Sequence, residues 1–291
     1  MALLRARPGR RGWAEITAEV LAAGSAIAVW EQLVPPVLVS PAAESDALEA
    51  AARQVAGWTG QGWRVLTILD EDYPARLRAI HQAPPVLFAR GHVARDDVAV
   101  SVVGSREASV RGLDIAAGVA RGLVARGVTV LGGLALGVDA AAHRAALAAG
   151  GRTVGVIGTG IDRAYPAANR ELQEQVAERG LVLSQFWPGA APQRHNFLMR
   201  NATMSGYGLA TVVVEAGEQS GSRAQARIAV GHGRPVILTS LVVARNDWAR
   251  ALVGRPGVHV AGRLHAVLDL VDQLIGEPAA AGAAPSRLAS C

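Results

Sequence analysis

The pattern of hydrophobic positions changes near residue 98. From there on, short runs that are apolar throughout alternate with segments of helical spacing, and most of the runs open onto a glycine-containing turn. Runs of this kind predict strands that are covered on both faces. The predicted strands are Val98 to Val103, Val128 to Leu131, Thr153 to Ile157, Leu181 to Ser184, Thr211 to Glu215, Pro235 to Leu238 and Val258 to Val260.

The segments between these runs predict helices, because apolar residues recur there at the spacing of one helix face. The predicted helices are Ala108 to Ala125, Asp139 to Ala149, Asn169 to Arg179, Arg200 to Gly206, Ser222 to Gly231, Trp248 to Leu252 and His265 to Ile275. Strands that alternate with helices indicate an α/β fold with a doubly wound, mostly parallel sheet of the Rossmann-like type.

The first part of the chain has a different pattern. Two helical segments, Trp13 to Leu33 and Asp46 to Trp58, are separated by the proline-rich stretch Pro35 to Pro41. Val65 to Asp70 predicts a short strand. A Pro-Pro pair further on excludes a helix there, so we interpret the segment after this strand as an extended connector.

These patterns predict a small helical region over residues 1–64, a Rossmann-like domain with its connector over residues 65–276, and a disordered tail over residues 277–291. With 291 residues, 51% of them hydrophobic, the chain can bury a substantial core. Its start carries arginines where a signal peptide needs an apolar stretch, and no run reaches the roughly 20 apolar residues of a membrane span. We expect a cytoplasmic protein with no membrane partner.

Residue counts exclude several chemistries. Lysine is missing from the sequence, so all 29 cationic side chains are arginines, and a P-loop lysine or a Schiff-base lysine is impossible. The single cysteine, Cys291, provides neither a disulfide framework nor a Cys-based metal site, and we expect no metal and no cofactor. The formal charge of +5 favours a polyanionic partner. A compositional preference of the source genome for arginine would give the same charge.

Three of the predicted strands end in unusual turns. In doubly wound sheets ligands bind beyond the carboxyl ends of the strands, where glycines permit close backbone approach and helix N-termini attract anions. Ser105 and Ser222 can each cap a helix or donate a hydroxyl to an anion, and Arg106 supplies a planar donor. The turns therefore predict a phosphate-binding edge, or else ordinary capped turns. They are "GSR" at Gly104 to Arg106, "GGLALG" at Gly132 to Gly137 and "EQSGS" at Glu218 to Ser222.

Acidic residues offer two further candidates. Asp139 and His143 lie four positions apart on one helix face, and we expect a structural pair in which Asp139 accepts a hydrogen bond from His143. Glu215 ends the fifth strand of the series, where a carboxylate can act in N-glycosidic hydrolysis or can cap a neighbouring turn.

The segment "QRHNFLMRN" mixes cations with an aromatic residue. Arg194 and Arg200 can follow a phosphate backbone while Phe197 stacks on a base, as in sites for single-stranded nucleic acid. The other interpretation places Phe197 in the core.

Several blocks together resemble one protein family. They are "YPARLRAIHQAPPVLFARG", "VVGSREASVRG", "GGLALGVDAAAHRAAL", "GTGIDRAYPAANREL", "SQFWPG", "NFLMRNATMSG" and "VVVEAGEQSGSRAQARIAVGHGRPV", and they occur in family order. The family is that of DNA-processing protein A (DprA, also called Smf), within the Rossmann group that includes the LOG nucleotide hydrolases.

The resemblance implies a dimeric, non-enzymatic protein of DNA-mediated transformation and recombination. Such a protein binds and protects incoming single-stranded DNA and loads a RecA-type recombinase. The alternative is a LOG-type enzyme or sensor of a nucleoside phosphate, with Glu215 as its carboxylate. The resemblance implies a binding site made by Gly104, Ser105, Arg106, Gly132, Gly133, Arg194, Phe197, Arg200, Asn201, Ser220, Gly221 and Ser222.

This sequence departs from the family pattern at a few positions. Leu136 and Ala202 stand where the family usually has basic residues, and residues 239–257 replace a glycine- and asparagine-containing loop. We also expect no counterpart of the winged-helix domain that is common at the C-terminus of the family.

Overall fold

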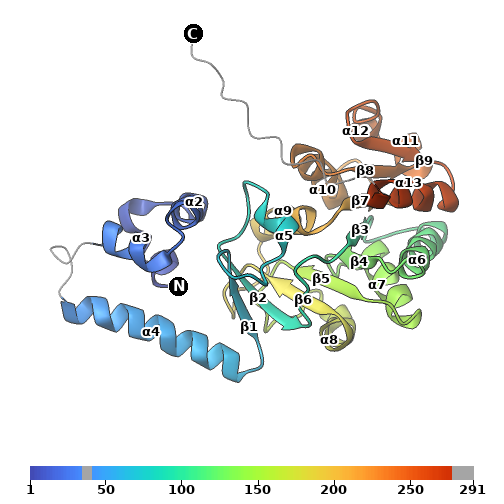
Figure 1. Ribbon diagram of the computed structural model, residues 1–291. Coiled ribbons are helices and arrows are strands. Elements are labelled where there is room, and N and C mark those ends of the chain that lie inside the picture. The colour runs from blue at the N-terminus through green and yellow to red at the C-terminus, as the bar shows by residue number, and fades with distance from the viewer. Residues whose placement is uncertain (35–40, 277–291) are drawn as a thin grey trace, which may run out of the picture.

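The computed structural model describes residues 1–34 and 41–276 (Figure 1). Most of the predicted break at Pro35 to Pro41 and the whole predicted tail at 277–291 lie outside the described residues. None of the described helices is both long and apolar enough to cross a membrane.

The described residues form one nine-stranded sheet in the order β1-β2-β6-β5-β4-β3-β7-β8-β9. All neighbours from β6 to β9 pair in parallel, whereas β2 pairs antiparallel with both β1 and β6. This confirms the predicted fold class. The strands are β1 (Arg64–Thr67), β2 (Val86–Gly91), β3 (Ala99–Val103), β4 (Thr129–Gly132), β5 (Thr153–Ile157), β6 (Leu181–Ser184), β7 (Ala210–Val213), β8 (Val236–Thr239) and β9 (Val258–Ala261).

Helices cover both faces of the sheet, because each inner strand is apolar on both sides. Val100 and Val102 of β3 pack with α6, α7 and α13, whereas Val103 belongs to a second cluster that includes α9 and α10. The helices of this domain are α5 (Ala75–Arg78), α6 (Val110–Val124), α7 (Val138–Ala148), α8 (Arg170–Arg179), α9 (Arg194–Tyr207), α10 (Gly221–Gly231), α11 (Ser240–Arg245), α12 (Asp247–Arg250) and α13 (Leu264–Gly276), with a short 3-10 turn at Ala167–Asn169.

The N-terminal residues form α1 (Ala2–Ala6), a 3-10 turn (Pro8–Arg10), α2 (Trp13–Ala23), α3 (Ala26–Leu33) and α4 (Pro41–Gly60). The single helix expected over Trp13 to Leu33 is two helices. Gly24 ends α2 with a positive φ of 63°, and the Ser25 hydroxyl accepts the amide of Ala28 to start α3.

Aromatic side chains join these helices to the sheet. The rings of Trp13 and Trp58 lie 5.9 Å from that of Trp187, which follows β6, and Trp58 also lies 5.0 Å from Phe88 of β2. The N-terminal helices therefore pack against the antiparallel end of the sheet.

The connector differs from the prediction. It contains α5 and then β2, whose first residues are buried between β1 and β6. The Pro-Pro pair excluded a helix correctly. The sequence interpretation did not identify the following "VLFARG" as an antiparallel strand, which pairs with β1 on one side and with distant β6 on the other.

Two helices also differ in extent. The helix expected at Arg200 to Gly206 begins six residues earlier, at Arg194 in α9, so all but the first residue of the segment "QRHNFLMRN" belongs to this helix. The helix expected at Trp248 to Leu252 is α12, and the unpredicted α11 precedes it.

The strand order reverses between β3 and β7, which are neighbours in the sheet although more than 100 residues separate them. At such a switch point the loops after the two strands diverge to opposite faces and leave room for a ligand. The backbone amide of Ser105 donates to the carbonyl of Glu215 over 2.6 Å and links these two loops.

Candidate functional site

A small pocket of about 100 Å³ lies beyond the carboxyl ends of β3, β4 and β5. Segments far apart in the sequence form it: the loop after β3, the loop after β4, the loop after β5 and the first half of α9. The residues that line it are Arg106, Gly133, Ala135, Leu136, Tyr165, Pro166, Phe197 and Arg200.

Arg200 forms part of the pocket wall and is only 7% exposed. Its Nη1 donates to the carbonyl of Val156 over 3.0 Å, and its buried Nε has no hydrogen-bond partner among the described residues. Burial lowers the pKa of this guanidinium, an effect that Asp139 opposes and Arg106 reinforces. The pocket therefore contains a buried cation with an unused donor.

Asp139 lies behind the pocket at the start of α7. Its carboxylate accepts the amide of Gly133 over 2.8 Å and so orients the loop after β4. Burial raises the pKa of Asp139, while Arg200 and the amides of Gly133 and Ala135 act in the opposite direction. One acidic group thus faces the two basic groups Arg106 and Arg200.

The expected hydrogen bond between Asp139 and His143 is wrong. His143 contacts Thr153 of β5 instead, with 2.6 Å between Nδ1 and Oγ1. The Thr153 hydroxyl donates to the carbonyl of Val130, so Nδ1 of His143 carries the proton that it donates to Thr153. Complete burial lowers the pKa of His143 to about 3 and keeps it neutral at pH 7.

The ring of Phe197 lies near both cations of the pocket. The guanidinium carbons of Arg106 and Arg200 each lie 5.9 Å from the centre of its ring. The ring packs on Gly158, where an added Cβ would lie 2.8 Å from Cδ1 of Phe197. Tyr165 contacts the same ring, with 5.6 Å between ring centres and a tilt of 40°.

Packing against Arg200 requires a glycine at position 133. A Cβ built on it would lie 1.4 Å from Nη1 of Arg200, so any larger residue would displace the buried guanidinium. Its neighbour Gly132 is restricted in the same way by His143. The sequence interpretation assigned these glycines to close approach of a ligand, whereas their immediate neighbours are the Arg200 and His143 side chains.

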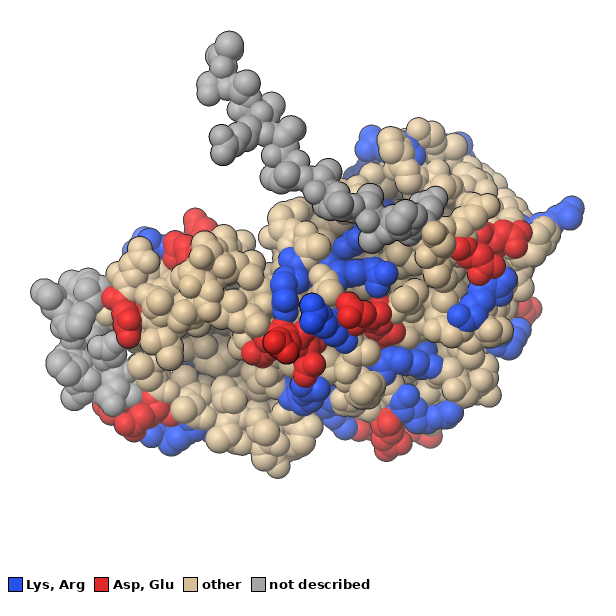
Figure 2. Space-filling view, viewed as in Figure 1, with Lys and Arg blue, Asp and Glu red and all other residues tan. Residues whose placement is uncertain are grey.

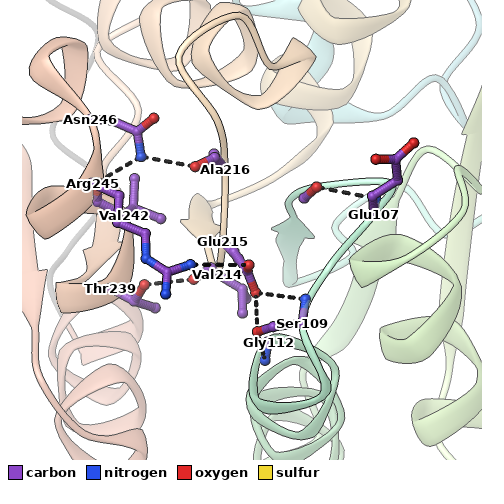
Figure 3. Close-up of polar contacts among 11 residues, drawn as sticks. Glu107, Ser109, Gly112, Val214, Glu215, Ala216, Thr239, Val242, Arg245 and Asn246 are labelled. Atoms are coloured by element: carbon purple, nitrogen blue, oxygen red, sulfur yellow. Dashed lines mark hydrogen bonds and ion pairs between the residues drawn. The ribbon is translucent and has the colours of Figure 1, made fainter.

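Glu215 lies outside the pocket, at a junction between α6 and α11 (Figure 3). One carboxylate oxygen accepts both the backbone amide and the hydroxyl of Ser109, over 3.1 and 2.7 Å, and the other lies 3.7 Å from Nη1 of Arg245. Ser109 in turn caps α6 by accepting the amide of Gly112. A carboxylate therefore already occupies the N-terminus of α6.

The capping serines also differ from the expectation. Ser109 caps α6, whereas Ser105 accepts the amide of Glu107 within its own turn. Ser220 caps α10 by accepting the amide of Ser222. In both turns, the one that contains Ser105 and the one that contains Ser220, the serine hydroxyl thus already accepts a hydrogen bond from a nearby backbone amide.

The structure brings together only part of the predicted site. Arg106, Gly133, Phe197 and Arg200 line the pocket. Arg194 is exposed at the start of α9. Asn201, which follows Arg200 in the sequence, is buried. The predicted residues that do not line the pocket are Gly104, Ser105, Gly132, Arg194, Asn201, Ser220, Gly221 and Ser222, and Glu215 does not line it either.

Sequence reasoning missed the wall formed by Tyr165 and Pro166. Both follow β5, and the rule that ligands bind at strand ends could have singled out Tyr165. Leu136 was noticed only as a missing cation, but it lines the pocket and is 42% exposed.

Charge alone does not single out a site on the face shown in Figure 2. Basic side chains lie mainly over the sheet domain beside acidic ones, and the N-terminal helices show mostly uncharged surface. Within the described residues, His, Cys, Asp and Glu side chains form no group of three or more that could hold a metal ion.

Comparison with known proteins gives a consistent result. Residues 64–251 match the model of the family described as DNA recombination-mediator protein A. The chain is 40% identical over 190 residues to the putative DNA processing protein DprA of Mycobacterium tuberculosis, covering 60% of this chain and 49% of that protein. The chain spans about half the length of the curated relatives it matches.

Two solved structures have a similar fold. The crystal structure of DprA from Streptococcus pneumoniae aligns with a TM-score of 0.67 and 33% identity over 79% of this chain and 82% of that one. A structure of DNA processing protein A from Helicobacter pylori, described by its single-stranded DNA binding mode, aligns with a TM-score of 0.64 and 22% identity over 72% and 96%.

Proposed function

Since the chain belongs to the DNA recombination-mediator protein A family, we propose that it binds single-stranded DNA at the pocket around Arg106, Phe197 and Arg200. The observation that carries this proposal is the surplus of positive charge in that pocket. Two guanidinium groups lie 5.9 Å from one aromatic ring, and a single buried carboxylate, Asp139, stands behind them. A phosphate would supply the missing negative charge.

A single strand fits this pocket better than a duplex. Its unpaired bases can leave the stack and contact an aromatic side chain while arginines follow the backbone. The pocket offers Tyr165 and Phe197 for the first contact and the two arginines for the second. The Helicobacter pylori relative, whose structure is described by its binding of single-stranded DNA, has the same fold.

In the cell, we propose a role in DNA-mediated transformation and recombination. The bound strand would be protected and passed to a RecA-type recombinase, with the protein acting in the cytoplasm as a homodimer rather than as an enzyme. The names of the curated relatives, which are DNA processing proteins, support the first part of this role.

The alternative of a nucleotide N-glycosidic hydrolase has less support. Its candidate carboxylate, Glu215, accepts two hydrogen bonds from Ser109 and lies beside Arg245, away from the pocket. Release of free base from nucleoside monophosphates by the purified protein would favour this alternative.

Salt-dependent binding tests the proposal. Fluorescence anisotropy with a labelled oligothymidine should give an affinity that falls with salt at a log-log slope of about −2 to −3.5, as for roughly three to five phosphate contacts on a single strand. Arg106→Ala should weaken binding and reduce that slope by about 0.7. Arg121→Ala, an exposed arginine in the last turn of α6, is the matched control and should leave the slope unchanged.

Equal affinity for a duplex of the same sequence would contradict the proposal. An equal change of the salt slope in Arg106→Ala and Arg121→Ala would also contradict it. That result would indicate that DNA binds to charge spread over the surface and not to the pocket.

A further inference from the structure

Basic side chains gather near the amino ends of β3, β7 and β8, at the edge of the sheet opposite to the pocket. Arg76 lies in α5, and His81 follows that helix. His232 ends α10, and Arg234 lies just before β8. These segments meet because α5 packs on α9 and α9 packs on α10 (Figure 1). We call these residues the basic cluster.

The two arginines of the basic cluster donate to backbone carbonyls. Nη2 of Arg234 donates to the carbonyl of Arg76 over 3.0 Å, and Nη1 of Arg76 donates to the carbonyl of Asp97 over 3.1 Å. The buried Nε of Arg234 has no hydrogen-bond partner among the described residues. Neither guanidinium forms an ion pair with a carboxylate in that part of the chain. Burial and the charge of Arg76 lower the pKa of Arg234.

The acidic residues that precede β3 have other partners. The carboxylate of Asp97 pairs with Nε of Arg152 over 2.9 Å and accepts the hydroxyl of Thr129. The carboxylate of Asp96 is exposed and lies 4.0 Å from Nε of Arg95. The two arginines of the basic cluster therefore keep an unbalanced positive charge.

The two histidines of the basic cluster lie beside these arginines. The rings of His81 and His232 are 5.4 Å apart between centres. Nδ1 of His232 lies 3.1 Å from the hydroxyl of Ser205, and its Nε2 lies 2.9 Å from Oε1 of Gln82. Burial, together with His81 and Arg234, lowers the pKa of His232 to about 4, so its ring is neutral at pH 7. A bound anion would act against that shift, because an opposite charge favours the protonated ring.

We propose that the basic cluster binds a phosphate group, held by the guanidinium groups of Arg76 and Arg234, with His81 at its solvent-exposed side. Guanidinium groups present several donors in a planar fork that matches the oxygens of a phosphate. The inference goes beyond the proposed function, because none of these residues lines the pocket. The phosphate belongs either to a free ion or to a part of a DNA strand that extends past the pocket.

Histidine signals in the proton NMR spectrum test this site locally. Inorganic phosphate, exchanged for chloride at constant ionic strength, should shift the ring signals of His81 and His232, which His81→Asn and His232→Asn assign. It should also raise the pKa of His232, because its charge offsets those of Arg234 and His81. In Arg234→Gln the dissociation constant for phosphate should rise at least about tenfold, since a charge-assisted hydrogen bond is lost.

A second variant avoids the buried arginine. His81 is exposed and makes no hydrogen bond within the described residues, so His81→Ala should leave the melting temperature unchanged. It should weaken phosphate binding about two- to tenfold, as read from the signal of His232. Thermal melting of Arg234→Gln shows whether that variant folds.

Two control variants locate the bound phosphate. Arg121→Gln removes an exposed arginine of α6, on the other face of the sheet, and should leave the phosphate-induced shifts as they are. Arg106→Ala removes a cation of the pocket and should also leave them unchanged. A loss of the shifts in either control equal to that in Arg234→Gln would overturn the inference.

A long oligothymidine and a short one that fills only the pocket distinguish the source of the phosphate. If a strand reaches the basic cluster, Arg234→Gln lowers the salt slope of the long probe by about 0.7 and leaves that of the short probe unchanged. If both slopes stay the same while inorganic phosphate still shifts the histidine signals, the ligand is a free phosphate.

The inference is overturned if phosphate leaves the signals of His81 and His232 unchanged. It is also overturned if phosphate shifts them equally in the unaltered protein and in Arg234→Gln. Failure of the unaltered protein to bind oligothymidine would reject the proposed function instead, since the titration with inorganic phosphate does not depend on DNA.

Discussion

Two pairs of an arginine and a carboxylate lie at the same edge of the sheet, and they differ in which partner is buried. At the pocket, Arg200 is the buried cation and Asp139 stands behind it, engaged with the loop after β4. At the junction, Glu215 is the buried anion, and the side chain of Arg245 is 65% exposed.

The difference shows which of the two places can bind an anion. Glu215 has its oxygens occupied by Ser109 and Arg245, so the junction is complete within the protein. Arg200 retains a buried donor that is unpaired among the described residues, and it lies near a second arginine. Unpaired buried donors are costly to a folded protein, so each calls for an explanation, of which a ligand is one.

The largest expected effect comes from breaking the pocket pair. Arg200→Ala takes from buried Asp139 the larger of its two opposing charges, Arg106 being the other, so the free energy of unfolding should fall by up to about 3–5 kcal/mol in urea denaturation. The double variant Arg200→Met with Asp139→Asn removes both charges and should recover most of that loss. A loss below about 1 kcal/mol for Arg200→Ala would show that the two charges are not coupled.

Breaking the junction should cost less. Glu215→Ala removes the acceptor of the Ser109 amide and the negative charge at the N-terminus of α6, and should lower the free energy of unfolding by about 1–2 kcal/mol. DNA affinity should stay the same. Glu107→Ala, which removes an exposed acid from the loop that contains Ser109, serves as the control for the stability measurement. A large loss of DNA affinity in Glu215→Ala would place the junction within the binding site.

The pH dependence of the free energy of unfolding tests the protonation state of the buried His143. Burial lowers the pKa of His143 to about 3, below the usual 6.5. Between these values the unfolded chain binds a proton that the folded chain does not, so stability should fall as pH is lowered from about 6.5 to about 3.

His143→Gln should therefore reduce the slope of the unfolding free energy against pH by up to about 1.4 kcal/mol per pH unit in this window. Urea denaturation at several pH values between the two pKa values measures it. His232, whose pKa is lowered to about 4, contributes equally to both proteins and cancels. Identical slopes would mean that His143 is protonated in the folded protein.

The smallest effect is expected for Arg245→Ala. Its guanidinium is mostly exposed and 3.7 Å from Glu215, so the free energy of unfolding should change by less than about 1 kcal/mol. DNA affinity should not change either. If Arg245→Ala weakens DNA binding as much as Arg106→Ala, the contrast between pocket and junction is wrong.

The order of strands and helices after residue 98 was predictable because each element satisfies a local rule. The run "TVGVI" at Thr153–Ile157, for example, carries no charged residue on either face, and it becomes a buried parallel strand. The missed strand β2 depends instead partly on its pairing with β6, which lies far away in the sequence.

The sequence by itself determined the α/β class, the exclusion of lysine chemistry and the position of Arg106 directly after a strand. Only the tertiary structure decided which charges are paired. Asp139 and Glu215 both follow apolar strands in the sequence, but one orients a loop amide behind a cationic pocket and the other holds the capping serine of a helix. The physical reason is that hydrogen bonds and burial depend on distances between segments, which the spacing of residues along the chain does not fix.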